Sequence, residues 1–143
     1  QHEIRRYLDR ISGPLLDRID IQVEVDAVPV EEIQATGREE SSQTVRERVQ
    51  KARLLQQERY LKENIFCNAQ LDARQLKLYC ALPSAAQEVL HLAMARYGMS
   101  MRAYGRILKV ARTIADLRGG GGIVTEDVAE AIRYRNLDGK YWR

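Results

Sequence analysis

The chain has 143 residues, of which 45% are hydrophobic and 30% are charged, which is typical of one folded domain and excludes wholesale disorder. Its net charge of +3 permits an anionic partner without requiring one. Cys67 and Cys80 are far apart and form neither a zinc motif nor a CxxC redox motif. No apolar run approaches the roughly 20 residues of a membrane span, and no signal peptide is recognisable. We therefore expect a cytoplasmic protein without membrane contact and, since Gln1 is not Met, a piece of a longer chain.

The N-terminal part predicts a short helix followed by a solitary strand. Apolar residues recur at helical spacing over 2–12, and Gly13 and Pro14 stop this pattern. Apolar and polar residues then alternate over 19–25, which is the clearest strand pattern in the sequence. A lone strand leaves its backbone groups unpaired. We therefore expect its partners in a missing part of the protein or in another copy.

The rest of the sequence predicts a helical domain. Helical periodicity and cap residues indicate helices over 42–61, 72–80, 83–98 and 100–117, and another from Thr125, which is expected to cap it. In the first of these, Val45, Val49, Ala52, Leu55 and Arg59 mark one face. Arginine and lysine crowd the remainder of that helix, which could touch nucleic acid or any other acidic partner. Four glycines at 119–122 predict a flexible break before the last helix.

Arg102 is a candidate binding residue at the start of the helix predicted over 100–117. With Arg106, Lys109 and Thr113 it falls on the face opposite an apolar stripe, and a charged face of this kind is commonly just solvated. The stripe consists of Tyr104, Ile107, Leu108, Ala111, Ile114 and Ala115. Its own position differs, because exposed N–H groups at a helix start together with an arginine can bind phosphate. Both interpretations of Arg102 remain open on the residues alone.

Arg18 is the second candidate, and it lies just before the predicted strand. Asp17 and Asp20 could pair with it at the surface, which would contribute little. A loop at a strand end is also where functional residues commonly lie on a rigid base. The phosphate-binding pattern GxxxxGK[ST] is absent, since the Gly139–Lys140 pair is followed by Tyr141. The sequence shows no hydrolase triad.

Three stretches together resemble one family. They are "ISGPLLDRIDIQVEV" at 11–25, "NAQLDARQLKLYCAL" at 68–82 and "SMRAYGRILKVARTIADLRGGGGIVTEDVAEAIRYR" at 100–135. The first resembles the end of the ATPase core in magnesium-chelatase-like AAA+ ATPases, in the competence-related ComM helicase branch. The last resembles the C-terminal helical lid of the same branch.

The resemblance implies a mainly α fold: an AAA+ C-terminal helical lid bundle preceded by the last helix and strand of the α/β core. It divides the chain into the end of the ATPase core (1–27), a connection with an inserted long helix (28–62) and the lid domain (63–143). A freestanding helical module that binds nucleic acid or a protein partner is the alternative, and the solitary strand counts against it.

The resemblance also implies roles for the two arginines. Arg18 would be the arginine finger, acting in trans on the nucleotide of a neighbouring subunit, and Arg102 would be the sensor-2 arginine, contacting the ATP phosphates. The phosphate-binding loop and the Mg²⁺ ligands lie upstream in this family, so the chain alone is not expected to bind ATP and Mg²⁺ or to hydrolyse ATP. The implied partners are its own ATPase core, neighbouring subunits of a ring, commonly a hexamer, and DNA.

Overall fold

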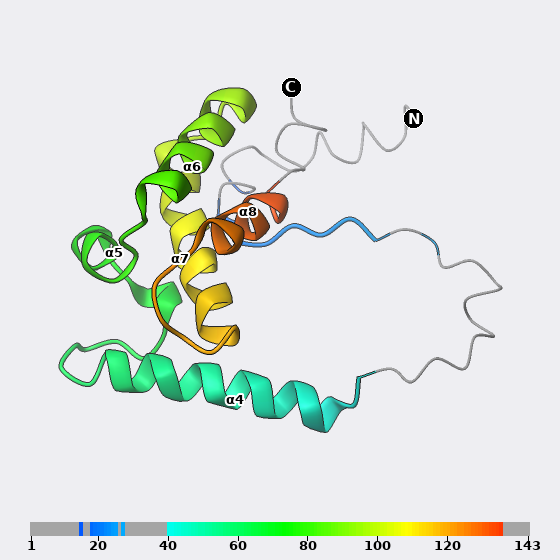
Figure 1. Cartoon of the computed structure of the whole chain (residues 1–143), viewed down its shortest axis with the longest axis vertical. Helices are drawn as coiled ribbons and strands as arrows, with labels where there is room; N and C mark the ends of the chain where they lie inside the picture. Colours follow the sequence, from blue (N-terminus) through cyan, green and yellow to red (C-terminus); the bar gives the residue numbers. More distant parts are fainter. Residues whose placement is uncertain (1–14, 16–17, 26, 28–39, 136–143) are drawn as a thin grey trace.

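The computed structural model describes residue 15, residues 18–25, residue 27 and residues 40–135 (Figure 1). Within this part of the chain the structure has five α-helices, one short 3-10 helix and no β-strand. The helices are α4 (Ser42–Arg59), η1 (Asn68–Gln70), α5 (Ala73–Tyr79), α6 (Ser84–Tyr97), α7 (Met101–Leu117) and α8 (Thr125–Arg133). The mainly helical fold class is confirmed, whereas the helix predicted over 2–12 lies outside the described residues.

Side-chain caps fix where three of these helices begin. The Ser41 hydroxyl accepts a hydrogen bond from the first turn of α4 (3.2 Å), and the Ser100 hydroxyl accepts one from Ala103 N–H in α7 (3.1 Å). At α5, Asp72 and Gln75 form a capping box, in which each side chain accepts the backbone N–H of the other residue (2.7 and 3.0 Å). These acceptors satisfy N–H groups that have no partner within a helix, which is why the sequence could predict the caps at Asp72 and Ser100.

The start of α8 differs from the prediction that Thr125 would cap it. Val124 occupies the N-cap position, and the Asp127 carboxylate accepts its N–H (2.9 Å). The same carboxylate accepts two hydrogen bonds from the Arg118 guanidinium (3.0 and 3.2 Å). Burial alone would raise the pKa of Asp127, but the hydrogen bonds from Arg118 and Val124 outweigh burial and lower it. The hydrogen bond at the start of this helix is therefore made by the Asp127 carboxylate and not by the Thr125 hydroxyl.

The hydrophobic core is built around α7, which runs through the middle of the helical domain (Figure 1). Its apolar stripe is buried as predicted, with Ile107, Ala111 and Ala115 each 0% exposed. Leu90 from α6 and Val128 from α8 are equally buried against it. Burial of a large aliphatic side chain contributes about 1.5–3 kcal/mol, so this stripe is a main source of stability.

Residues 19–25 are extended but do not form the strand predicted from their alternation. No β-bridge involves them within the described residues, and Ile21, Val23 and Val25 are 51%, 61% and 83% exposed. The strand was predicted to pair with a missing part of the protein or another copy, and this stays a prediction, because a strand needs a second strand to pair its backbone groups. The described part of the chain supplies none.

The start of this extended segment is nevertheless attached to the helical domain. Gln22 N–H donates to the Tyr134 carbonyl (2.8 Å), and the Arg135 guanidinium donates to the Ile19 carbonyl (2.6 Å). Figure 1 shows the segment passing behind α8 and then running away from the helices. These contacts place residues 19–22 beside the end of the helical domain.

The second half of α4 packs against α7, whereas its first half projects beyond the domain (Figure 1). Ala52 and Gln56 are 3% and 4% exposed, but every residue from 40 to 51 is exposed. Val45 and Val49, which were expected on the packed face, are 37% and 45% exposed. The apolar face predicted for this helix is therefore covered only toward its C-terminal end.

Candidate functional site

Arg102 lies in the first turn of α7, and its side chain is exposed. Ser100 caps this end, the first turn contains no acidic residue, and the first N–H groups of a helix have no partners within it. No carboxylate of the described residues forms an ion pair with Arg102. The positive end of a helix dipole does not stabilise a cation. The N-terminus of α7 together with Arg102 therefore favours an anion from outside the described residues.

Arg18 is also exposed, in a turn closed by a hydrogen bond from its own N–H to the Leu15 carbonyl (2.9 Å). The interpretation that Asp20 neutralises Arg18 is wrong, because the Asp20 carboxylate is bound by Arg106 instead. Asp17, the other candidate partner, lies outside the described residues. Within the part of the chain that is described, Arg18 has no ion-pair partner.

An ion pair between Asp20 and Arg106 connects the segment that carries Arg18 to the helix that carries Arg102. Arg18 precedes Asp20 by two residues, and Arg102 precedes Arg106 by one helical turn. The two paired side chains are 44% and 25% exposed, so water shields their attraction only in part. The two arginines predicted from the sequence therefore come from elements that lie side by side.

The polar face of α7 is not the solvated surface that its charges suggest. Besides the ion pair of Arg106, the Lys109 ammonium group donates to the Ala69 carbonyl (2.8 Å). Thr113 accepts a hydrogen bond from the Asn68 amide (2.9 Å). Of the four polar residues predicted to share this face, Arg102 is exposed to solvent, whereas the other three are half-buried.

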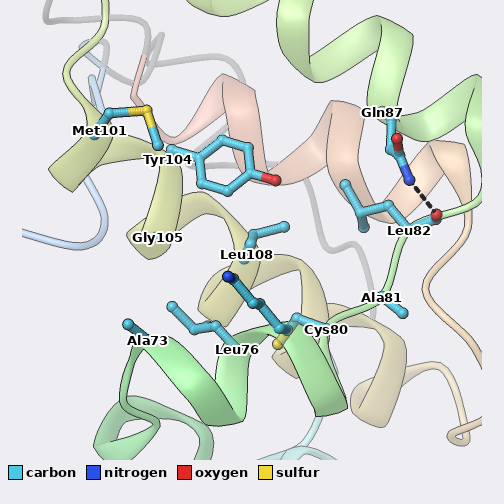
Figure 2. A pocket seen from close by; sticks show the side chains of 11 residues that line it. Ala73, Leu76, Cys80, Ala81, Leu82, Gln87, Met101, Tyr104, Gly105 and Leu108 are labelled. Atoms are coloured by element: carbon cyan, nitrogen blue, oxygen red, sulfur yellow. Dashed lines mark hydrogen bonds between the residues drawn. The ribbon is translucent and has the colours of Figure 1, made fainter.

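A cavity of about 480 Å³ opens between α5, α6 and the first half of α7 (Figure 2). Its lining is mostly apolar and consists of Ala73, Leu76, Lys77, Cys80, Ala81, Leu82, Gln87, Met101, Tyr104, Gly105 and Leu108. The Gln87 amide at its edge already donates to the Leu82 carbonyl (2.9 Å; dashed in Figure 2). The cavity is therefore suited to an apolar group.

The Cys80 thiol in this cavity is chemically inert at neutral pH. Burial raises its pKa to about 11, although the nearby Arg112 guanidinium acts in the opposite direction. A thiol is nucleophilic only as the thiolate, so Cys80 stays protonated and unreactive near pH 7. The cavity thus provides no thiolate nucleophile.

Asp116 is the centre of a buried polar cluster that the sequence analysis missed. Its side chain is 0% exposed and accepts hydrogen bonds from Arg112 (3.1 Å), Asn68 (2.9 Å) and both terminal nitrogens of Arg59. The hydrogen bond to Asp116 raises the pKa of Arg59 further above its ordinary value. Because Arg59 belongs to α4 and Asp116 to α7, this cluster fastens the long helix to the domain.

Asn68 completes the cluster by using every polar group that it has. Its carbonyl oxygen accepts the Tyr60 hydroxyl (2.6 Å), and its backbone N–H donates to the Gln56 side chain (3.2 Å). Its amide nitrogen donates to Thr113 and to Asp116 (both 2.9 Å). A buried polar group is tolerated when it is fully hydrogen-bonded, and this network fulfils that condition at Asn68.

The described residues offer positive charge but no metal site. Among them, no group of three or more His, Cys, Asp or Glu side chains is arranged to hold a metal ion. Over the same residues, no helix has both the length and the apolar character needed to cross a bilayer.

Comparison with known proteins gives two family matches. Residues 39–135 match the family described as magnesium chelatase, subunit ChlI C-terminal, and residues 1–33 match magnesium chelatase, subunit ChlI. Competence protein ComM of Haemophilus influenzae is 46% identical over 136 residues, and the uncharacterized protein YifB of Escherichia coli is 40% identical over 136 residues. The alignments cover 94% and 93% of this chain but only 26% of each relative, so the chain spans about a quarter of their length.

The C-terminal family match contains all the helices of the described structure, and the second match contains the turn with Arg18. The first match alone extends over more than half of the chain. The chain therefore belongs to the magnesium chelatase ChlI family of AAA+ proteins, with a ComM-like sequence.

Proposed function

We propose that this chain supplies two arginines to ATP hydrolysis in a ring-forming AAA+ ATPase. Arg18 is the arginine finger for a neighbouring subunit, and Arg102 is the sensor-2 arginine. The observation that carries the proposal is the Asp20–Arg106 ion pair, which joins the elements bearing these two exposed guanidinium groups. Neither group is consumed by an ion pair within the described chain.

The chemistry suits arginine. Negative charge spreads over the oxygens of the transferred phosphoryl group, and a guanidinium stabilises that charge with a fork of donors. ATP and Mg²⁺, if bound, would supply the phosphoryl group and a neutralising cation, and the exposed Arg18 and Arg102 are the residues that would contact the phosphates. The sequence has no GxxxxGK[ST] loop, so the remaining phosphate and Mg²⁺ contacts belong to polypeptide outside this chain.

The proposed work of the parent protein is DNA remodelling of a branch-migration type, carried out by a hexameric ring in the cytoplasm. The 46% identity to a protein named for competence supports DNA as the material acted on. The match of residues 1–33 to a second magnesium chelatase model counts against the freestanding helical module.

The test of the finger uses the parent protein. Arg18→Ala should lower the ATPase rate at least a hundredfold, since an arginine finger contributes about 10³–10⁵ in kcat, while nucleotide affinity stays within a few-fold of wild type. Rates are measured by phosphate release and affinity by a fluorescent ATP analogue. Arg96→Ala, which removes another exposed arginine, should leave both unchanged. A wild-type rate in Arg18→Ala would reject the assignment.

Mixing two inactive variants tests whether Arg18 acts between subunits. Arg18→Ala subunits keep an intact phosphate-binding loop, and loop-damaged subunits keep Arg18. In a mixed ring, an intact loop can lie next to an intact finger, so part of the ATPase activity should return. A finger that acts within its own subunit would give no recovery at any mixing ratio.

A further inference from the structure

The projecting half of α4 has little cover within the described structure, where Thr44, Glu47, Arg48 and Lys51 face the end of α7 across an open pocket. Residues 40–51 are all exposed, and Figure 1 shows this end of the helix extending beyond the remaining helices. Ser41 caps it, and the Gln43 amide donates to Glu47 one turn later (2.8 Å). Local hydrogen bonds thus stabilise this half of the helix, because few tertiary contacts do. A helix of this kind commonly has a role outside its own domain.

One face of α4 carries a basic stripe, defined as Arg46, Gln50, Arg53 and Gln57. At about 100° per residue these positions, spaced i, i+4, i+7 and i+11, lie in one line along the helix. All four are exposed, and the stripe contains no carboxylate. The long side chains can therefore reach outward together.

The two arginines of the stripe differ from the other arginines of the same helix. Arg48 is bound in a bidentate pair by Glu40 (2.7 and 3.1 Å), and Arg59 is bound by Asp116. Arg46 and Arg53 have no ion-pair partner among the described residues. Their charges are thus open to an external anion, whereas those of Arg48 and Arg59 are already used.

We propose that the basic stripe of α4 docks on the phosphate backbone of duplex DNA, an inference that rests on the DNA partner of the proposed function. Arg46 and Arg53 are seven residues apart, or about 10.5 Å along a helix. Both guanidinium groups extend from the same face of the helix, so they can contact the closely spaced phosphates of one duplex together. Arginine and glutamine both donate to phosphate oxygens, and such contacts carry no sequence preference.

The chemistry of the stripe favours DNA over a protein partner. The energetic centre of a protein interface is usually aromatic or apolar, whereas this stripe contains only guanidinium and amide groups. Val45 and Val49 on one side of the stripe and Leu54 on the other are exposed, so a protein partner could contact α4 beside the stripe.

The test compares Arg46→Gln/Arg53→Gln with the matched pair Arg96→Gln/Arg133→Gln in the parent protein. The control removes the same charge from exposed positions on α6 and α8. Anisotropy of a labelled 30-base-pair duplex is titrated between 50 and 200 mM salt, with a single strand of equal length as a second probe. Each lost phosphate contact reduces the slope of log K against log salt by about 0.9. The magnitude of the slope should therefore fall by about 2 in the stripe variant. The control should keep the wild-type slope.

The outcomes separate this proposal from the one on which it rests. If the wild-type parent binds the duplex and the stripe variant shows the same slope of log K against log salt, the stripe is not a DNA contact. The proposed function then stays intact. Absence of DNA binding by the wild-type parent rejects the DNA part of both. Binding of the single strand alone, or an equal loss of slope in the control, also overturns the docking on duplex DNA. ATPase without DNA should remain at the wild-type rate in both variants.

Discussion

At Asp116, two guanidinium groups and one amide converge on a carboxylate that is 0% exposed. Replacing one member of a buried ion pair leaves the opposite charge without compensation, which costs about 3–5 kcal/mol. The same contact seen at the surface, between Arg48 and Glu40, is worth about 0–1 kcal/mol because water screens it. Burial, rather than the number of charges, decides which pair matters.

Asp116→Asn should therefore lower the free energy of unfolding by about 3–5 kcal/mol, because Arg59 and Arg112 lose their counter-charge. Glu40→Gln, which breaks the exposed pair with Arg48, should cost less than about 1 kcal/mol. Both are measured by urea denaturation followed by far-UV circular dichroism. Equal losses in the two variants would contradict the assigned role of the cluster.

The sequence permitted only part of this residue-scale picture. Arg112 and Asp116 stand four residues apart in one helix, a spacing that indicates contact. Arg59 is 57 residues from Asp116, and no local pattern could pair them. The exposure of Arg18 and Arg102 was consistent with the sequence, but the ion pair of Asp20 with Arg106 depends on tertiary contact and could not be predicted.

The connection between α7 and α8 shows what a glycine run does at the scale of an element. Gly119, Gly120 and Gly121 have φ values of 117°, 92° and 82°, a region that other residues rarely adopt. Gly120 N–H donates to the Ala115 carbonyl (2.8 Å), and the Gly121 carbonyl accepts the Arg112 guanidinium (2.8 Å). The run predicted as a flexible break is a hydrogen-bonded turn that requires left-handed backbone.

Gly120→Ala should destabilise the domain by about 1–2 kcal/mol, the cost of left-handed backbone for an L-residue. A Cβ atom there would also lie 3.3 Å from Leu55 Cδ1 of α4. Gly122→Ala is the matched control, because its φ is not positive and nothing lies within 4 Å of the added atom. Thermal unfolding of both variants measures the difference, and equal midpoints would contradict it.

Local signals explain why the helices were predicted better than the strand. Asp72, Ser100 and Gly98 cap their helices through contacts within a few residues, so the sequence alone reveals them. The residues at 19–25 have a strand pattern, but pairing depends on a neighbour that the described chain lacks. Thr125 was chosen as a cap by residue type, whereas Val124 occupies the N-cap position and its N–H is bound by the Asp127 carboxylate.

For the whole molecule, all buried hydrophobic side chains of the described residues lie between Ala52 and Ile132. The attached N-terminal segment adds the Asp20–Arg106 pair and two backbone contacts, but no buried apolar side chain. The helical domain should therefore hold its fold without that segment.

A chain reduced to residues 40–143 should unfold cooperatively, with a free energy of unfolding lower than that of the 143-residue chain by about 1–3 kcal/mol. The loss is the sum of one exposed ion pair and two hydrogen bonds. Urea titration and circular dichroism measure it. A shortened chain without a cooperative transition would show that the first 39 residues are part of the folding unit.

Helix α4 is anchored to the domain only through its second half, so its first half can act as a lever arm. Its fulcrum is the cluster around Asp116, and the ten residues of its free arm span about 15 Å. A tilt of about 10° at the fulcrum therefore displaces the tip by roughly 3 Å. A small rotation about the Asp116 cluster would therefore move the free end of α4 farther than any residue close to the cluster.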